Sequence, residues 1–263
     1  MHKASPRSIF KFQSISSAIW DAPSSPNIYA HIDLDLTAIA NSESGKINFN
    51  PLALVACAAQ RAWHKEEFLR RKVGMWGRIV PKPFGLTFVA NTQDHELRFL
   101  PVLNPNLLQI SEVENWLMDQ AQILRDNPDG QLWGAVKHLH RIPRRWVHGA
   151  VRAWIFMTQQ LGWTFGRWSE PNPKFGTVLI SDLKFLDAEV IFLAAVAPTF
   201  SAVTLGVGKI TLKPKCIHGE VRARWVLPLY FTADHRLLNG SHCALLLQKF
   251  REEVDSLLVF ARL

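Results

Sequence analysis

The segment FTADHRLLNGSHCALLLQKF, residues 231–250, places a histidine and an arginine between an apolar run and an asparagine-glycine turn. An apolar helix is expected to begin after the turn. A neutral imidazole can take the proton of a thiol or hydroxyl as that group attacks a thioester, a step worth about 10² to 10⁴ in rate. His235 could therefore be a general base, or it could be a core histidine satisfied by backbone groups.

The stretch DHRLLNG, residues 234–240, resembles the His-x-x-x-Asp-Gly signature of chloramphenicol acetyltransferases and of the catalytic domains of dihydrolipoyl acyltransferases. In the latter the local form is Asp-His-Arg-x-x-Asp-Gly, sometimes with Asn for the second Asp, and Asn239 stands at that position here. FGTVLISDL, residues 175–183, is similar to their Gly-Thr-Phe-Thr-Ile-Ser-Asn-Leu strand and places Ser181 on the hydroxyl position. Two further stretches, APTFSAVTLGVGKI (197–210) and FVANTQDHELRFLPVL (88–103), resemble their Pro-Pro-Gln-Ala-Ala-Ile-Leu-Ala-Val-Gly strand and Asp-Gly-Leu-x-x-Pro-Val hairpin.

The resemblance implies an acyltransferase with His235 as general base, Ser181 as hydrogen-bond donor to the oxyanion of the tetrahedral intermediate, and Asn239 as loop support. It implies a homotrimer or a multiple of trimers, in which neighbouring subunits supply the histidine and the serine. The donor would be a coenzyme A thioester or an acylated carrier, and the acceptor a thiol, hydroxyl or amine. No metal or tightly held cofactor is implied.

Alternatives stay open for these assignments. Ser181 could end a strand and initiate an Asx-like turn with Asp182. The chain could also be a non-catalytic trimeric scaffold, or a membrane-docking protein of the same fold. Lys184 stands where the resemblance has a glycine, which predicts a remodelled loop beside the active site and leaves the acyl group and acceptor undetermined.

The other histidines near these stretches favour structural roles. His242 is expected in the first turn of the closing helix, on a polar face. His138 and His140 lack the i, i+4 spacing of a helical metal site.

The segment at about 130–170 is a basic, tryptophan-rich insertion that the resemblance does not cover. No acidic residue lies between Gly130 and Ser169, and half of the ten tryptophans lie there. Residues 141–168 could form a helix on an anionic membrane surface, where Trp and Arg suit the headgroup boundary. They could instead form a lid or trimer contact, and this interpretation is favoured because tryptophan is usually buried. Nucleic-acid binding by stacking is the least favoured.

The remaining pattern predicts an α+β fold, a chloramphenicol acetyltransferase-like two-layer sandwich with a mixed β-sheet and flanking helices, as a single catalytic domain over 1–263. Strands are expected at 28–40, 84–91, 96–103, 175–183, 202–213 and 223–234. Helices are expected at 50–71, capped by Asn50 with Pro51 at the first position, at 110–127, with Ser111 and Glu114 in capping-box positions, and from near Ser241. The closing helix should bury Ala244, Leu245, Leu247, Phe250, Val254 and Leu257.

Composition bounds the class of protein and its surroundings. The chain has 263 residues, 48% of them hydrophobic, and a net charge of +8, which is typical of a folded chain with an ample core. The uncharged run at 190–208 is broken by Pro198, so we expect a buried helix, a turn and a core strand there, not a membrane span. Three widely spaced cysteines and an N-terminus without a secretory signal favour a cytoplasmic protein, with membrane association open through 141–168. Only some thirty residues precede the first strand, so a stand-alone catalytic domain without a lipoyl domain is expected.

Overall fold

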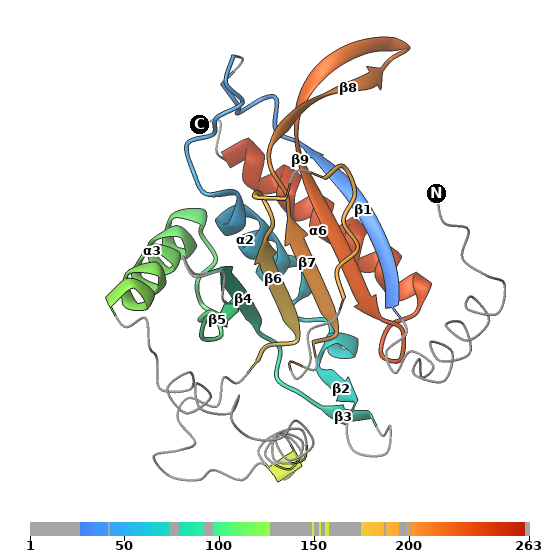
Figure 1. Ribbon diagram of the computed structural model, residues 1–263. Coiled ribbons are helices and arrows are strands. Elements are labelled where there is room, and N and C mark those ends of the chain that lie inside the picture. The colour runs from blue at the N-terminus through green and yellow to red at the C-terminus, as the bar shows by residue number, and fades with distance from the viewer. Residues whose placement is uncertain are drawn as a thin grey trace, which may run out of the picture.

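A mixed β-sheet with helices on one face forms the centre of the structure (Figure 1). It is a computed structural model that describes residues 27–41, 43–73, 79–91, 97–126, 149, 153, 156, 157, 175–186, 188–194, 199 and 201–260. Within these residues the main sheet has the order β1-β9-β7-β6-β4-β5, and β8 also pairs with β9. Among the described strand pairs, β4–β6 and β6–β7 are parallel and the others antiparallel. The strands are β1 (Asn27–Asp35), β4 (Leu86–Asn91), β5 (Leu97–Phe99), β6 (Val178–Asp182), β7 (Val203–Val207), β8 (Thr211–Ile217) and β9 (Glu220–Asp234).

In the described part of the chain, three helices build the second layer. They are α2 (Pro51–Trp63), α3 (Ile110–Asp126) and α6 (Gly240–Phe260), and α2 packs against both of the others and against β6 and β7. A short helix η1 (Glu67–Leu69) and a small hairpin of β2 (Arg71–Val73) and β3 (Ile79–Pro81) follow α2. The Trp63 indole donates a hydrogen bond to the carbonyl of Leu246, 2.9 Å away, so it ties α2 to α6 inside the core.

The strand period of two divides the β9 side chains between the two faces of the sheet. Leu229, Phe231 and their neighbours on the same face belong to the core beneath the helices. Burying one such side chain contributes about 1.5–3 kcal/mol. Tyr230 and Thr232 point to the other face, where their hydroxyls donate to the carbonyls of Ala188 (3.3 Å) and Leu193 (2.9 Å). The segment 188–194 therefore lies over the face that the helices leave open.

The predicted fold class is confirmed, because the sheet is mixed and its helices flank one face. The predicted start of α2 is also correct. Asn50 is the N-cap, its side-chain oxygen accepts from the Leu52 N–H at 3.0 Å, and Pro51 occupies the first helical position.

Several predicted bounds are wrong. β1 ends at Asp35 and not at residue 40, and the helix from residue 50 ends at Trp63 and not at 71. The strand expected over 202–213 is two strands, β7 and β8, separated at Gly208. A Cβ at Gly208 would lie 2.7 Å from a side-chain carbon of Pro228. The segment between β7 and β8 therefore passes so close to β9 that glycine suits this position.

The predicted capping box of α3 is wrong as well. Helix α3 begins at Ile110, and Glu112 accepts from the backbone N–H of Gln109 at 3.1 Å. Glu114 instead accepts from the Asn50 N–H of the other helix at 2.9 Å. The carboxylate predicted to cap its own helix thus joins α3 to the start of α2.

The buried side of α6 is rotated from the predicted one. Ala244 and Leu245 are exposed, so these two assignments are wrong, whereas Phe250, Val254 and Leu257 are buried as predicted and the half-buried Leu247 packs against the core. The buried face consists of Cys243, Leu246, Phe250, Val254, Leu257 and Leu258.

The long uncharged run also differs in part from its prediction. Residues 190–194 are not helical, and Phe192 is 71% exposed there, but the core strand expected after the turn is present as β7. In the described part of the chain, no helix combines the length and apolar character that a bilayer crossing requires. The insertion at 130–170, with His138 and His140, lies outside the described residues apart from positions 149, 153, 156 and 157.

Candidate active site

His235 lies in a tight turn between β9 and α6, where Asp234 holds the chain. The Asp234 Oδ1 atom accepts from the Arg236 N–H at 3.0 Å, and its Oδ2 atom pairs with Arg236 Nη2 at 2.7 Å. The hydrogen bonds that the Arg236 guanidinium donates to the Asp234 carboxylate raise the pKa of Arg236, against the opposing effect of burial. The Asp234 carbonyl accepts from the N–H groups of Leu237 and Leu238 at 3.0 and 2.9 Å. The turn is therefore rigid while the His235 side chain stays exposed.

The ring of His235 has a defined tautomer. Its Nδ1 atom lies 3.1 Å from the carbonyl oxygen of Leu238, and a carbonyl can only accept, so Nδ1 carries the hydrogen. In the neutral ring the Nε2 lone pair is then free to accept a proton. Among the described residues none makes a hydrogen bond to Nε2. This is the arrangement that a general base requires.

Asn239 holds the start of α6. Its side-chain oxygen accepts from the Ser241 hydroxyl at 2.7 Å and from the His242 N–H at 2.9 Å. The Asn239 backbone carbonyl accepts from Cys243 at 3.0 Å. The side chain thus acts as a helix N-cap, and any part in catalysis stays a prediction.

Ser181 lies near the carboxyl end of β6, on the sheet face away from the helices. It is half-buried and pairs in register with Gly206, which pairs in turn with Tyr230. A Cβ on Gly206 would lie 2.5 Å from Leu183 and 2.6 Å from Leu193, so the segment after β6 folds back beside this row. The turn itself is made by Asp182, whose Oδ1 atom accepts from the Lys184 N–H at 3.1 Å.

One chain does not bring His235 and Ser181 together. The Asp234 N–H donates to the carbonyl of Ala202, whereas Ser181 is level with Gly206. Ala202, just before β7, and Gly206 within it are separated by about 13 Å of extended chain, and β6 and β9 lie on opposite sides of β7. The two predicted site residues therefore lie at opposite ends of the sheet.

A second polar cluster continues the row of Ser181 across the sheet. His31 stacks on Tyr230 with ring centroids 5.2 Å apart, and its Nε2 atom lies 3.3 Å from Asp33 Oδ1. Asp33 also pairs with Lys213, at 3.1 Å, and with Lys215. Burial alone would raise the pKa of Asp33, but the two lysines hold it below its usual range. Sequence reasoning missed this cluster, although the strand period of two already puts His31 and Asp33 on one face.

Lys82 is a buried cation at the other end of the sheet. Its ammonium donates to the carbonyls of Gly176 and Thr199, each at 2.8 Å, just before β6 and β7. Burial, and secondarily the charge of Lys72, lower the pKa of Lys82 to about 7. Sequence reasoning did not single out this residue, because no local pattern marks a lysine that closes two distant segments.

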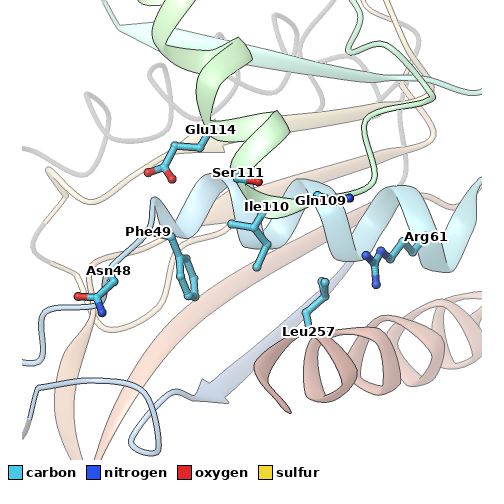
Figure 2. A pocket seen from close by; sticks show the side chains of 8 residues that line it. All are labelled: Asn48, Phe49, Arg61, Gln109, Ile110, Ser111, Glu114 and Leu257. Atoms are coloured by element: carbon cyan, nitrogen blue, oxygen red, sulfur yellow. The ribbon is translucent and has the colours of Figure 1, made fainter. Parts of the chain in front are cut away.

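A hollow of about 660 Å³ opens among the helices (Figure 2). Phe49, Ile110 and Leu257 supply its apolar surface, and Arg61 and Glu114 lie toward different sides of it. It lies near the carboxyl end of α6, some 25 Å along that helix from the turn of His235. The hollow is thus on the helical side of the sheet and does not include either predicted site residue.

Comparison with known sequences identifies one family over the last part of the chain. Residues 172–260 match the family described as 2-oxoacid dehydrogenases acyltransferase (catalytic domain). These residues include Ser181, His235 and Asn239. No match to a curated protein is found. The predicted resemblance to an acyltransferase catalytic domain is confirmed by this match.

Solved structures extend the likeness to the whole chain. The probable dihydrolipoamide acetyltransferase of Listeria monocytogenes 4b F2365 has 17% identity and a TM-score of 0.57, over 98% of this chain and 94% of that one. The dihydrolipoamide acetyltransferase of Azotobacter vinelandii has 18% identity and a TM-score of 0.56, over 97% and 91%. The truncated catalytic core of the 2-oxoacid dehydrogenase multienzyme complex of Thermoplasma acidophilum has 13% identity and a TM-score of 0.56, over 98% of each chain. At these identities the likeness establishes the fold, which is the predicted one.

Proposed function

We propose that this chain is an acyltransferase that moves an acyl group from a thioester donor to a thiol, hydroxyl or amine acceptor. The donor is acyl-CoA or an acylated carrier, and no metal takes part. The observation that carries the proposal is the exposed side chain of His235, whose Nδ1 atom is engaged by the Leu238 carbonyl so that the Nε2 lone pair is left to act as a base. The family match over residues 172–260 supplies the reaction class.

The proposed reaction proceeds through a tetrahedral intermediate. His235 Nε2 takes the proton of the acceptor as the acceptor attacks the thioester carbonyl carbon. The carbonyl oxygen becomes an oxyanion, to which the Ser181 hydroxyl donates a hydrogen bond. The intermediate then expels the thiolate of the donor, and the imidazolium of His235 returns the proton to it. The proton that His235 takes from the acceptor is thus returned to the leaving thiolate, and the oxyanion collapses to the carbonyl of the product.

The proposed site needs two protomers, because His235 and Ser181 are at opposite ends of one sheet. We place the His235 of one protomer against the Ser181 of its neighbour in a homotrimer or a multiple of trimers. The large apolar side chains exposed on the open sheet face, Tyr29, Phe185, Leu186, Val190 and Phe192, suit a contact between copies of the chain. One solved structure of this fold is the cubic core of the pyruvate dehydrogenase multienzyme complex.

The study of the Azotobacter vinelandii enzyme concerns a serine, a histidine and an asparagine in its catalytic mechanism. Ser181, His235 and Asn239 have the same order here, with the same spacing between histidine and asparagine. This agreement supports the assignment of the three residues to one site.

The proposal is tested with a His235→Asn variant in an assay of acetyl-CoA consumption against a panel of thiol, hydroxyl and amine acceptors. Turnover is expected to fall by about 10² to 10⁴, the contribution of a general base. His218→Asn is the matched control, since His218 lies in the β8–β9 turn, far from the site, with a positive φ of 51° that asparagine tolerates. Equal turnover in both variants and the wild type would refute the catalytic assignment and favour the scaffold alternative.

We further propose a cytoplasmic location and, separately, peripheral membrane contact through residues 141–168. That segment lies outside the described residues apart from positions 149, 153, 156 and 157, so the proposal rests on its basic and tryptophan-rich sequence. Co-sedimentation with anionic vesicles, compared between the wild type and a variant with Trp146 and Trp154 replaced by serine, decides it. Binding that is equal in both proteins would contradict the membrane contact.

A further inference from the structure

We infer that His242 is a positioning residue for His235 and acts on it through the peptide group between Leu238 and Asn239. The inference rests on the proposed function, in which His235 is the base. His242 belongs to the first turn of α6, and sequence analysis placed it on a polar face without a role. The structure instead shows it half-buried against η1.

One peptide group connects the two imidazoles. Its carbonyl, from Leu238, lies 3.1 Å from His235 Nδ1, and its N–H, from Asn239, donates to His242 Nδ1 at 3.3 Å. Because the peptide unit is planar, the orientation that serves one ring also serves the other. The partners also fix opposite tautomers, with hydrogen on Nδ1 of His235 and on Nε2 of His242 when both rings are neutral.

The ring of His242 is held in place from two sides. It stacks on Phe68 with ring centroids 4.6 Å apart and an interplanar angle of 14°. Its own backbone N–H donates to the Asn239 side chain at 2.9 Å. Phe68 is held by η1, where the adjacent Leu69 is fully buried. Of these two contacts, the stack on Phe68 lies outside the loop of His235, so it presents the acceptor atom to the Asn239 N–H from a separate element.

When the N–H of a peptide group donates a hydrogen bond, the carbonyl of the same group becomes a stronger hydrogen-bond acceptor. Hydrogen bonds in a chain polarise one another, so the bond to His242 makes the Leu238 oxygen a better acceptor for His235. The gain is larger once His235 has taken up the proton, because its Nδ1–H is then part of a cation. His242 thus helps to hold the base in orientation and stabilises the imidazolium formed during the reaction.

The charged groups on the neighbouring elements are engaged with one another. Glu66, before η1, pairs with Lys249 of α6, and Asp234 pairs with Arg236 in the turn. Glu67 of η1 is exposed. Within the described residues no carboxylate lies within ion-pair distance of His242. The link to Asn239 needs the Nδ1 lone pair of His242 as the acceptor. A proton on Nδ1 would occupy that lone pair, so the link exists only with the neutral ring.

Two variants separate the hydrogen bond from the packing. His242→Phe keeps a flat ring against Phe68 but has no acceptor. His242→Asn loses the ring but carries an oxygen near the position of Nδ1. We expect His242→Phe to lower kcat by about 2- to 10-fold, the effect of one hydrogen bond, with KM for acetyl-CoA unchanged and the acid limb of the kcat profile moved to lower pH. His242→Asn is expected to retain more of the wild-type kcat and an acid limb close to that of the wild type.

Equal kcat and pH profiles for His242→Phe and the wild type would overturn the inference. So would equal losses in both variants that follow their losses in melting temperature, since that result means a packing role alone. A second readout does not need activity: ¹⁵N chemical shifts of the histidine rings report which nitrogen carries the hydrogen. We expect the Nδ1–H form of His235 in the wild type and a mixture of tautomers in His242→Phe. An unchanged His235 tautomer would refute the link even if His235 proved not to be catalytic, whereas failure of His235→Asn to alter turnover refutes the proposed function alone.

Discussion

Ser181 and His235 lie at opposite ends of the same sheet, on strands that flank β7 from its two sides. The Asp234 N–H is bonded to Ala202 before β7, and Ser181 is level with Gly206 near the end of β7. A reaction that needs both side chains at one carbonyl group therefore needs two copies of the chain.

Mixed oligomers should regain activity that neither parent has. Co-expression of differently tagged His235→Asn and Ser181→Ala chains gives oligomers in which about a quarter of the sites combine an intact histidine with an intact serine, if assembly is random. We expect oligomers purified through both tags to show turnover well above that of either variant alone. If both residues acted from one chain, no site in such an oligomer would be complete, and turnover would stay at the level of the variants.

Removal of the Ser181 hydroxyl should slow the reaction without unfolding the protein. Loss of one oxyanion donor costs about 10² to 10³ in kcat. Ser181→Ala is compared with Ser111→Ala, because Ser111 is an exposed serine of α3. The KM for acetyl-CoA and the far-UV circular dichroism are expected to stay close to those of the wild type. A kcat within twofold of the Ser111→Ala value would count against the oxyanion role.

Asn239 should contribute to stability as a helix cap. Replacement by alanine removes the acceptor for Ser241 and for the His242 N–H, and loss of such a cap costs about 0.5–2 kcal/mol in the free energy of unfolding. Aspartate keeps a side-chain oxygen in that position and should keep most of the stability. Urea unfolding at one fixed protein concentration measures both variants, since assembly makes the midpoint depend on concentration. Equal midpoints for Asn239→Ala and Asn239→Asp would contradict the cap.

Lys82 should make the protein more stable as the pH rises above neutrality. Its pKa is about 7 in the folded chain, against an ordinary value of 10.5, so between these limits the unfolded state binds more protons than the folded state. The contribution of this residue to the free energy of unfolding therefore rises from about pH 7 to about pH 10.5. Lys82→Gln keeps amide donors for the carbonyls of Gly176 and Thr199 but does not titrate. Urea unfolding across this range should give a smaller slope with pH for the variant, and identical slopes would show that Lys82 is not the group responsible.

The elements with strong local signals could be predicted from the sequence. Asn50 and Pro51 mark the start of α2, and alternating or β-branched runs mark β1, β4, β6, β7 and β9. The predictions failed where a partner distant in sequence decides. Glu114 satisfies the local spacing of a capping box, but the free N–H of Asn50 competes for its carboxylate. Residues 190–194 are apolar enough for a helix, but the carbonyl of Leu193 accepts from the Thr232 hydroxyl and that of the preceding Glu189 accepts from the Tyr230 hydroxyl, so the segment is held across β9.

The candidate site could be predicted only as a set of residues. DHRLLNG identifies the turn of His235, and the strand similar to that of the acyltransferases identifies Ser181. Neither motif contains the sheet register that separates the two side chains. The stacking of His242 on Phe68 likewise joins positions that are far apart in the sequence, so spacing alone could not give it a role.

The cysteines offer a built-in probe of assembly. Burial raises the pKa of the Cys57 thiol to about 11 and raises that of Cys243, whereas Cys216 is exposed on β8, in the hairpin that extends beyond the rest of the sheet (Figure 1). An alkylating reagent added to the isolated chain should therefore modify one thiol much faster than the other two. If that hairpin packs against a neighbouring subunit, the rate at which Cys216 is alkylated would fall on assembly. The labelling rate would then measure the fraction of assembled protein without any change to the sequence.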